Sequence, residues 1–214
     1  MHLYIGYKNY SSWSLRPWLA LKMADILFEE TLLTFAHDDS LKKFSEAHQL
    51  PAQVPVLMVG DWVIWDSLAI LEYLAETYPE KHLWPEDPQL RALARSAAAE
   101  MHSGFSALRS HFPMNCRTEK LVAANEAVML DLQRLAQIWQ RFEQADKPEG
   151  AFLAGQFSLV DAMFAPVMWR VRNYGLTVSL AFDRWAQAMY ELPAMQEWLA
   201  SAREEAWHMP AYER

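Results

Sequence analysis

The sequence predicts an α/β first third followed by an all-helical remainder, and three observations support this fold class. Short apolar runs at residues 3–7, 27–35 and 54–59 alternate with helical patterns in the first third of the chain. Residues 79–88 contain three prolines with acidic residues between them, a composition typical of a linker. Beyond this segment, apolar residues recur at helical spacings and no run resembles a strand.

These shifts in pattern predict two domains, residues 1–80 and residues 89–214, joined by a linker at residues 81–88. The chain has 214 residues, of which 52% are hydrophobic. That length allows one large domain or two small ones with a sizeable core. We find no internal repeat and no low-complexity segment.

The first strand is expected at residues 3–7 and the second within residues 27–35, with a helix around Trp18–Met23 between them. A strand, a helix and a strand in this order form a βαβ unit, so the two strands should be parallel. Residues 38–48 are polar and irregular, with one helical turn expected at residues 41–44.

A β-hairpin is expected next, because apolar runs at residues 54–59 and 62–65 flank the dipeptide Gly60-Asp61. Gly60 should adopt a positive φ in this turn. Asp66-Ser67 then opens a strongly apolar helix that includes residues 68–74.

The second half is expected to contain five helices, and Leu121 should begin the apolar stripe of the second one. Ser158-Leu159-Val160-Asp161 has the spacing of a capping box, with the acid shortened to Asp, and should start a buried helix. The expected helices span residues 89–111, 119–145, 158–172, 180–191 and 193–206.

Composition excludes several classes of function. The net charge of −8 disfavours nucleic acid and anionic membranes as partners. The single cysteine, Cys116, excludes an internal disulfide framework and a multi-cysteine zinc site. The seven histidines show no metal-binding spacing, so we expect no catalytic metal. With no leader pattern and no apolar run of membrane-spanning length, a cytosolic location is expected.

The most informative candidate site is the pair Ser11-Ser12, which lies where the first strand leads into the first helix. Free backbone N–H groups at a helix start favour negative charge. A serine hydroxyl at that position can donate to an anion such as a thiolate. The alternative is that one of the two serines only caps the helix.

Two further features also allow a structural or a functional interpretation. Pro55 opens a strand and has no backbone N–H to donate to a neighbouring strand, as is common for a proline at the edge of a sheet. If the Val54–Pro55 bond is cis, the Val54 backbone would instead turn outward and could pair with an extended ligand. Asp66 and Ser67 could cap a helix. They could instead hold an amino-acid head group, with Asp66 on its ammonium and Ser67 on its carboxylate.

His102, Phe105 and Arg109 share the first long helix of the second half. They are candidates for a second-substrate site if this face lines a cleft. The alternative is an ordinary half-buried helix face.

Taken in order, these motifs resemble the cytosolic glutathione transferases, over essentially the whole chain. Residues 10–16, Tyr-Ser-Ser-Trp-Ser-Leu-Arg, resemble the Ser-Ser-Cys-Ser-Trp-Arg signature of the zeta class, which includes maleylacetoacetate isomerases, with Trp13 in place of the cysteine. Gln53-Val54-Pro55 matches the family's cis-proline motif and Asp66-Ser67 its Glu/Gln-Ser pair. Residues 158–161 match its folding box.

The resemblance implies a thioredoxin-like N-terminal domain, a helical C-terminal domain and a homodimer. With Arg16 as the anchor, the zeta pattern selects Ser11 as the thiolate partner, whereas the theta and delta patterns select Ser12. We therefore expect Ser11, with Ser12 as the fallback. The implied glutathione contacts are Ser11, Gln53, Val54, Pro55, Asp66 and Ser67.

The implied activity is that of a glutathione transferase: the bound thiolate attacks a small electrophile, with glutathione as co-substrate and no metal. A cis-trans isomerase of the maleylacetoacetate type is an alternative that uses the same thiolate. A tyrosine-type enzyme would use Tyr7 instead, and a non-catalytic binding or regulatory protein would use only the fold.

Overall fold

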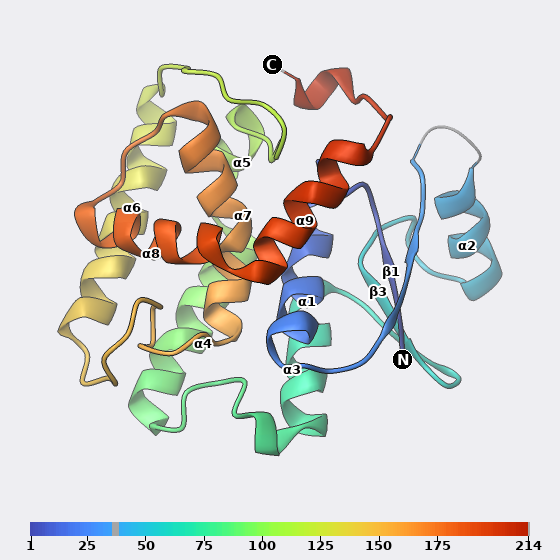
Figure 1. Ribbon diagram of the computed structural model, residues 1–214, viewed down its shortest axis with the longest axis horizontal. Helices are drawn as coiled ribbons and strands as arrows, with labels where there is room; N and C mark the ends of the chain where they lie inside the picture. The colour runs from blue at the N-terminus through green and yellow to red at the C-terminus, as the bar shows by residue number, and fades with distance from the viewer. Residues whose placement is uncertain (36–38, 214) are drawn as a thin grey trace.

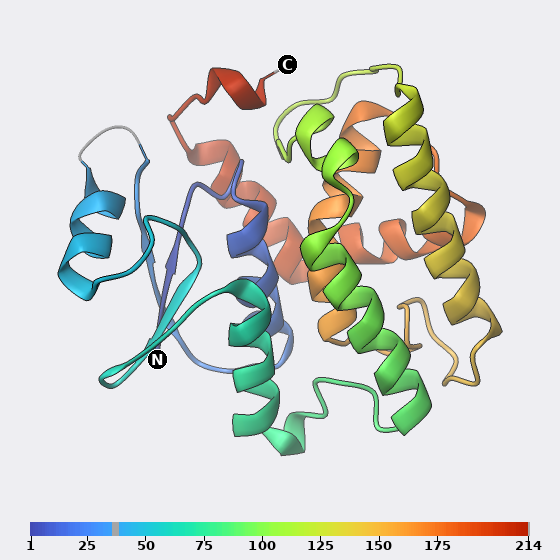
Figure 2. The same ribbon diagram turned by 180° about the vertical axis from the view of Figure 1, so that it is seen from behind.

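The computed structural model describes residues 1–35 and 39–213. Figure 1 and Figure 2 show two parts, a small sheet with helices on both sides and a larger bundle of helices. The first part contains β1 (His2–Ile5), α1 (Ser12–Met23), β2 (Glu29–Leu32), α2 (Ser40–His48), β3 (Val56–Val59), β4 (Trp62–Ile64) and α3 (Ser67–Thr77).

The sheet has the strand order β2-β1-β3-β4. β1 pairs with β2 in parallel, with Leu3 opposite Glu30, which confirms the predicted βαβ unit. β3 pairs antiparallel with β1 and with β4. The hairpin between β3 and β4 is also confirmed, with Gly60 at a φ of 59°.

The helices of this part cover opposite sides of the sheet. α1 and α3 lie on the side that faces the helical bundle, and α2 lies on the other (Figure 1, Figure 2). α2 is longer than the single turn expected from its polar sequence. Because α1 packs against α7 (Leu159–Tyr174) of the bundle, the start of α1 lies at the junction of the two parts.

The bundle follows a short 3₁₀ turn, η1 (Pro79–Lys81). The helix predicted at residues 180–191 has the same bounds in the structure, where it is α8 (Leu180–Glu191). The helices are α4 (Pro88–Ser103), α5 (Ser106–His111), α6 (Glu126–Gln144), α7 (Leu159–Tyr174), α8 (Leu180–Glu191) and α9 (Pro193–Glu204), followed by the 3₁₀ turn η2 (Pro210–Tyr212).

Two predicted helices need correction. The helix expected at residues 89–111 is two helices, because Gly104 is extended and Phe105 adopts a φ of 56°, in the left-handed region. The helix expected at residues 119–145 begins only after Asn125, whose side chain accepts the N–H of Val128. Leu121 therefore lies outside it, 88% exposed, and does not belong to the core.

α7 is the central helix of the bundle, and almost all of its residues are buried. It packs against α1, α4 and α8. Its predicted capping box is confirmed, with the Ser158 N–H donating to Asp161 Oδ2 at 2.9 Å. α7 therefore carries side chains from the bundle core to the start of α1.

After α9 the chain runs back to the loop between β1 and α1 (Figure 1). The sequence patterns did not predict this return of the C-terminal segment. The Glu205 carboxylate accepts the backbone N–H groups of Lys8 and Asn9. The Trp207 ring stacks on Tyr7, with centroids 4.9 Å apart. Of the helices in the described part of the chain, none has the length and apolar character to cross a membrane.

Candidate functional site

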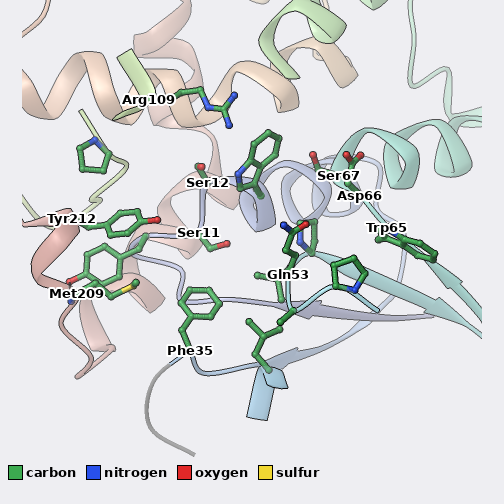
Figure 3. A pocket seen from close by; sticks show the side chains of 18 of the residues that line it. Ser11, Ser12, Phe35, Gln53, Trp65, Asp66, Ser67, Arg109, Met209 and Tyr212 are labelled. Atoms are coloured by element: carbon green, nitrogen blue, oxygen red, sulfur yellow. Dashed lines mark hydrogen bonds between the residues drawn. The ribbon is translucent and has the colours of Figure 1, made fainter. Parts of the chain in front are cut away.

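A cavity of about 1000 Å³ lies between the sheet part and the helical bundle (Figure 3). Phe105 is not among its lining residues; its side chain is buried in the core. All the other predicted site residues line the cavity: Ser11, Ser12, Gln53, Val54, Pro55, Asp66, Ser67, His102 and Arg109.

Ser11 is the N-cap of α1. Its Oγ lies 3.4 Å from the Ser14 N–H and donates to Ser14 Oγ at 2.8 Å. Ser14 Oγ also accepts the Gly6 N–H at 3.0 Å, so it ties the end of β1 to the start of α1. In Figure 3 the Ser11 hydroxyl points toward the side of the cavity where Gln53 lies.

Ser12 is the first residue of α1 and is more exposed than Ser11. Its Oγ accepts a hydrogen bond from Arg170 Nη2 at 3.3 Å. In Figure 3 the Ser12 hydroxyl points toward the side where Arg109 lies. The two adjacent serines therefore face different sides of one cavity.

The loop before β3 forms a second wall of the cavity. The Val54–Pro55 peptide bond is cis, as predicted. Gln53, Val54 and Pro55 all line the cavity, and Figure 3 shows Gln53 on the side of Asp66.

Asp66 and Ser67 occupy the start of α3. Asp66 Oδ1 accepts the Leu68 N–H at 2.9 Å, which is the predicted cap, and Asp66 Oδ2 lies 2.9 Å from His102 Nε2 of α4. Ser67 lines the cavity and is fully buried, and within residues 1–35 and 39–213 its hydroxyl has no hydrogen-bond partner. A buried hydroxyl without a partner is costly, and a ligand in the cavity could satisfy it.

Trp13 occupies the place of the family's cysteine and lies between two guanidinium groups. Arg16 Cζ is 4.2 Å and Arg109 Cζ 4.6 Å from the ring centroid, both within range of a cation–π contact. The His102 ring meets the same indole edge-on at 5.3 Å. Trp13 thus links α1 to α4 and α5.

Arg109 and Arg170 bring positive charge to the bundle side of the cavity. Arg109 donates to the backbone carbonyls of His102 and Gly104. Burial lowers the pKa of Arg109, and it lowers the pKa of Arg170 to about 10, at which Arg170 stays charged at neutral pH. Within residues 1–35 and 39–213, neither forms a salt bridge with a carboxylate. An anionic ligand would balance this charge.

The C-terminal segment adds lining residues that sequence patterns did not reveal. Met209, Ala211 and Tyr212 line the cavity. The segment is held by Arg117, which donates to the backbone carbonyl of Trp207 at 2.9 Å. No periodicity or motif marks this segment, so only the folded chain shows that it reaches the cavity.

Tyr7 does not line the cavity, although it is a candidate for a tyrosine-type site. It is 1% exposed, and its hydroxyl accepts the Phe35 N–H at 3.1 Å. In the described ranges, no three side chains of His, Cys, Asp or Glu are placed to hold a metal ion.

Comparison with known proteins gives a family model and several relatives of the glutathione S-transferase family. A family model described as the N-terminal domain of glutathione S-transferase matches residues 10–77. The maleylacetoacetate isomerase of Rattus norvegicus is 31% identical over 183 residues, 83% of this chain and 81% of the relative. Glutathione S-transferase 1 of Dianthus caryophyllus is 31% identical over 182 residues, 84% of this chain and 81% of the relative.

A similar solved structure is the holo form of maleyl pyruvate isomerase, described as a bacterial glutathione S-transferase of the zeta class. It superposes with a TM-score of 0.73 over 97% of this chain and 100% of that chain, at 22% identity. This likeness shows the fold, a thioredoxin-like first part followed by a helical second part.

Proposed function

Because the chain belongs to the glutathione S-transferase family, we propose that it binds glutathione in the cavity and activates the thiol for attack on a small electrophile. One observation carries the proposal. The serine pair at the start of α1, the cis-proline loop and the Asp66–Ser67 pair, far apart in sequence, line the same cavity.

The γ-glutamyl end of glutathione carries a carboxylate and an ammonium group. Ser67 is suited to the carboxylate, because its buried hydroxyl has no partner and lies at a helix start. Asp66 is suited to the ammonium. The cysteinyl part would pair with the Val54 backbone, and Gln53 would meet the glycyl end.

Ser11 is suited to the sulfur, because its hydroxyl faces the side where Gln53 lies, and it is at the positive end of α1 (Figure 3). A thiol at neutral pH is only a few per cent thiolate. A hydrogen bond to the thiolate and a helix N-terminus both lower the thiol pKa. When the Ser11 hydrogen turns to the sulfur, the Ser14 hydroxyl can turn to donate to Ser11, because hydroxyl hydrogens rotate freely.

Replacing Ser67 by alanine is expected to weaken glutathione binding by about 1–3 kcal/mol, because a buried carboxylate loses a donor. Isothermal titration calorimetry measures this directly. Ser96→Ala on α4 is the matched control, since the Ser96 hydroxyl is exposed and bonds only the carbonyl of Ala92. Equal affinities in wild type and Ser67→Ala would remove Ser67 from the site, and no binding by the wild type would refute the proposed function.

An isomerase activity is a second candidate, which one observation favours. Arg109 and Arg170 present positive charge to the bundle side of the cavity without an acidic partner among the residues described. A cis-enone that carries carboxylates, such as maleylacetoacetate, would meet this charge. Thiolate addition, rotation about the resulting single bond and expulsion of the thiolate would convert cis to trans and regenerate glutathione.

Replacing Arg109 by leucine is therefore expected to raise the KM for a carboxylate-bearing electrophile by about 10- to 100-fold, from the loss of one charged hydrogen bond. The KM for a neutral electrophile should change much less. Arg203→Leu on α9, an exposed position outside the cavity, is the control. Equal changes for charged and neutral electrophiles would argue against a carboxylate contact at Arg109.

We also propose a homodimer. Trp62 of β4 and Trp65 just after it are 68% and 50% exposed, and large exposed aromatic side chains of this kind are typical of interfaces. Light scattering should give twice the 24.8 kDa mass of the chain. A monomer mass at micromolar concentration would contradict this. No observation favours a non-catalytic role.

A further inference from the structure

The two cavity serines differ in their hydrogen bonding as well as in direction. Ser11 donates its hydrogen within the cap, to Ser14 Oγ. Ser12 accepts from Arg170, and in the described part of the chain no acceptor is found for its own hydrogen. A hydroxyl has one hydrogen and two acceptor sites, so this contact leaves the Ser12 hydrogen available to a ligand.

Arg170 is 5% exposed, and α7 brings it to the start of α1 from the bundle core. Its Nε has no hydrogen-bond partner among the residues that the structure describes. Among the described residues it forms no salt bridge with a carboxylate, and the guanidinium groups of Arg16 and Arg109 are close enough to interact with its charge. Arg170 is therefore a buried cation without a counter-ion in the described part of the chain, and its hydrogen bond to the Ser12 oxygen makes that hydroxyl a stronger donor.

The direction of the Ser12 hydroxyl indicates which of the two substrates it contacts. Its hydroxyl points toward the side of Arg109, away from Gln53 and from the proposed glutathione contacts (Figure 3). We therefore propose that Ser12 is a catalytic residue for the electrophile: its hydroxyl, oriented by Arg170, donates a hydrogen bond to the oxygen anion that forms on a carbonyl-conjugated substrate. This rests on the proposed function, and Arg170 is the positioning residue.

The reaction step is balanced without any further reactant. The thiolate donates an electron pair to the β-carbon of an α,β-unsaturated carbonyl compound, and a C–S bond forms. The π electrons of the C=C bond move to give an enolate, with the negative charge on the carbonyl oxygen. Ser12 donates to that oxygen. Collapse of the enolate then expels the thiolate in isomerisation, whereas protonation of its α-carbon by water gives the conjugate.

This role predicts a preference that depends on the reaction type. An alkyl halide is attacked by the same thiolate, but the charge leaves as halide and no carbonyl oxyanion forms. Ser12 and Arg170 should therefore matter for an unsaturated ketone and much less for an alkyl halide. Ser11 should matter for both.

The experiment measures kcat/KM of the full-length protein with glutathione and two neutral probes, an α,β-unsaturated ketone and an alkyl iodide. Ser12→Ala and Arg170→Met should each lower the value for the ketone by about 100-fold, as for loss of one oxyanion donor. The value for the iodide and the ultraviolet titration of the bound thiolate should stay close to wild type. Arg170→Lys should recover part of the ketone activity, because it keeps the charge.

Arg172→Met is the matched control, because Arg172 lies on the same helix but packs over Tyr190, 4.0 Å from the ring centroid. Equal losses for both probes with a raised thiol pKa would overturn the proposal, since Ser12 would then serve the sulfur. Unchanged ketone activity in Ser12→Ala would overturn it too, even if Arg170→Met does not fold. If the wild type forms no bound thiolate, the proposed function itself fails, and this proposal fails with it.

Discussion

Ser11→Ala should raise the pKa of the glutathione thiol in the binary complex and lower turnover with every electrophile by about 100-fold, the typical effect of removing one positioned donor. The physical reason is the loss of a donor that favours the charged sulfur at the start of α1. Each unit of pKa corresponds to about 1.4 kcal/mol of lost preference for the thiolate. Ultraviolet absorbance of the thiolate, titrated against pH, measures the shift directly.

Ser12 and Tyr7, close to Ser11 in the sequence, provide the controls. Ser12→Ala should leave the titration unchanged, although it should slow the reaction with unsaturated ketones. If Ser12→Ala shifts the titration and Ser11→Ala does not, the thiolate partner is Ser12, as the theta and delta spacing suggests. If only Tyr7→Phe shifts it, the enzyme is of the tyrosine type despite the buried position of Tyr7.

The fold class could be predicted because it depends on local patterns that survive in the folded chain. The turn at Gly60, the cap at Asp66 and the capping box from Ser158 to Asp161 are each set by residues within four positions of one another. Local signals of this kind predict where elements begin, and their order then predicts the architecture. The break at Phe105 was missed because a phenylalanine gives no sign that its backbone is left-handed.

That the proposed glutathione contacts line one cavity could be predicted for the same reason, since each belongs to a short motif in the first third of the chain. On the opposite side, His102 and Arg109 were candidates from their positions in one helical run, but the contributions of Arg170 and the C-terminal segment could not be predicted. Arg170 is 158 positions from the Ser12 hydroxyl that it contacts, and Tyr212, near the end of the chain, reaches the cavity only after the chain folds back. No sequence pattern predicts the Arg170–Ser12 contact or the position of Tyr212, because the residues involved are far apart in the chain.

Asp161→Asn should lower the free energy of unfolding by about 3 kcal/mol, because it leaves buried donors unpaired where the carboxylate now accepts them. Asp161 is fully buried. It accepts hydrogen bonds from Leu153 N at 3.0 Å, Trp185 Nε1 at 2.8 Å and both the N–H and the hydroxyl of Ser158. An asparagine amide has one acceptor oxygen and a donor in place of the other, so it cannot satisfy all of these groups.

The effect should be on stability rather than on the site, because Asp161 starts α7, the helix on which the bundle and α1 pack. Urea unfolding followed by circular dichroism measures it. Asp183→Asn in the first turn of α8 is the matched control, since that acid is exposed and should change stability by no more than about 0.5 kcal/mol. A variant at Asp161 that unfolds at the wild-type urea concentration would show that the four donors find other partners, and that the capping box is not what holds α7 in place.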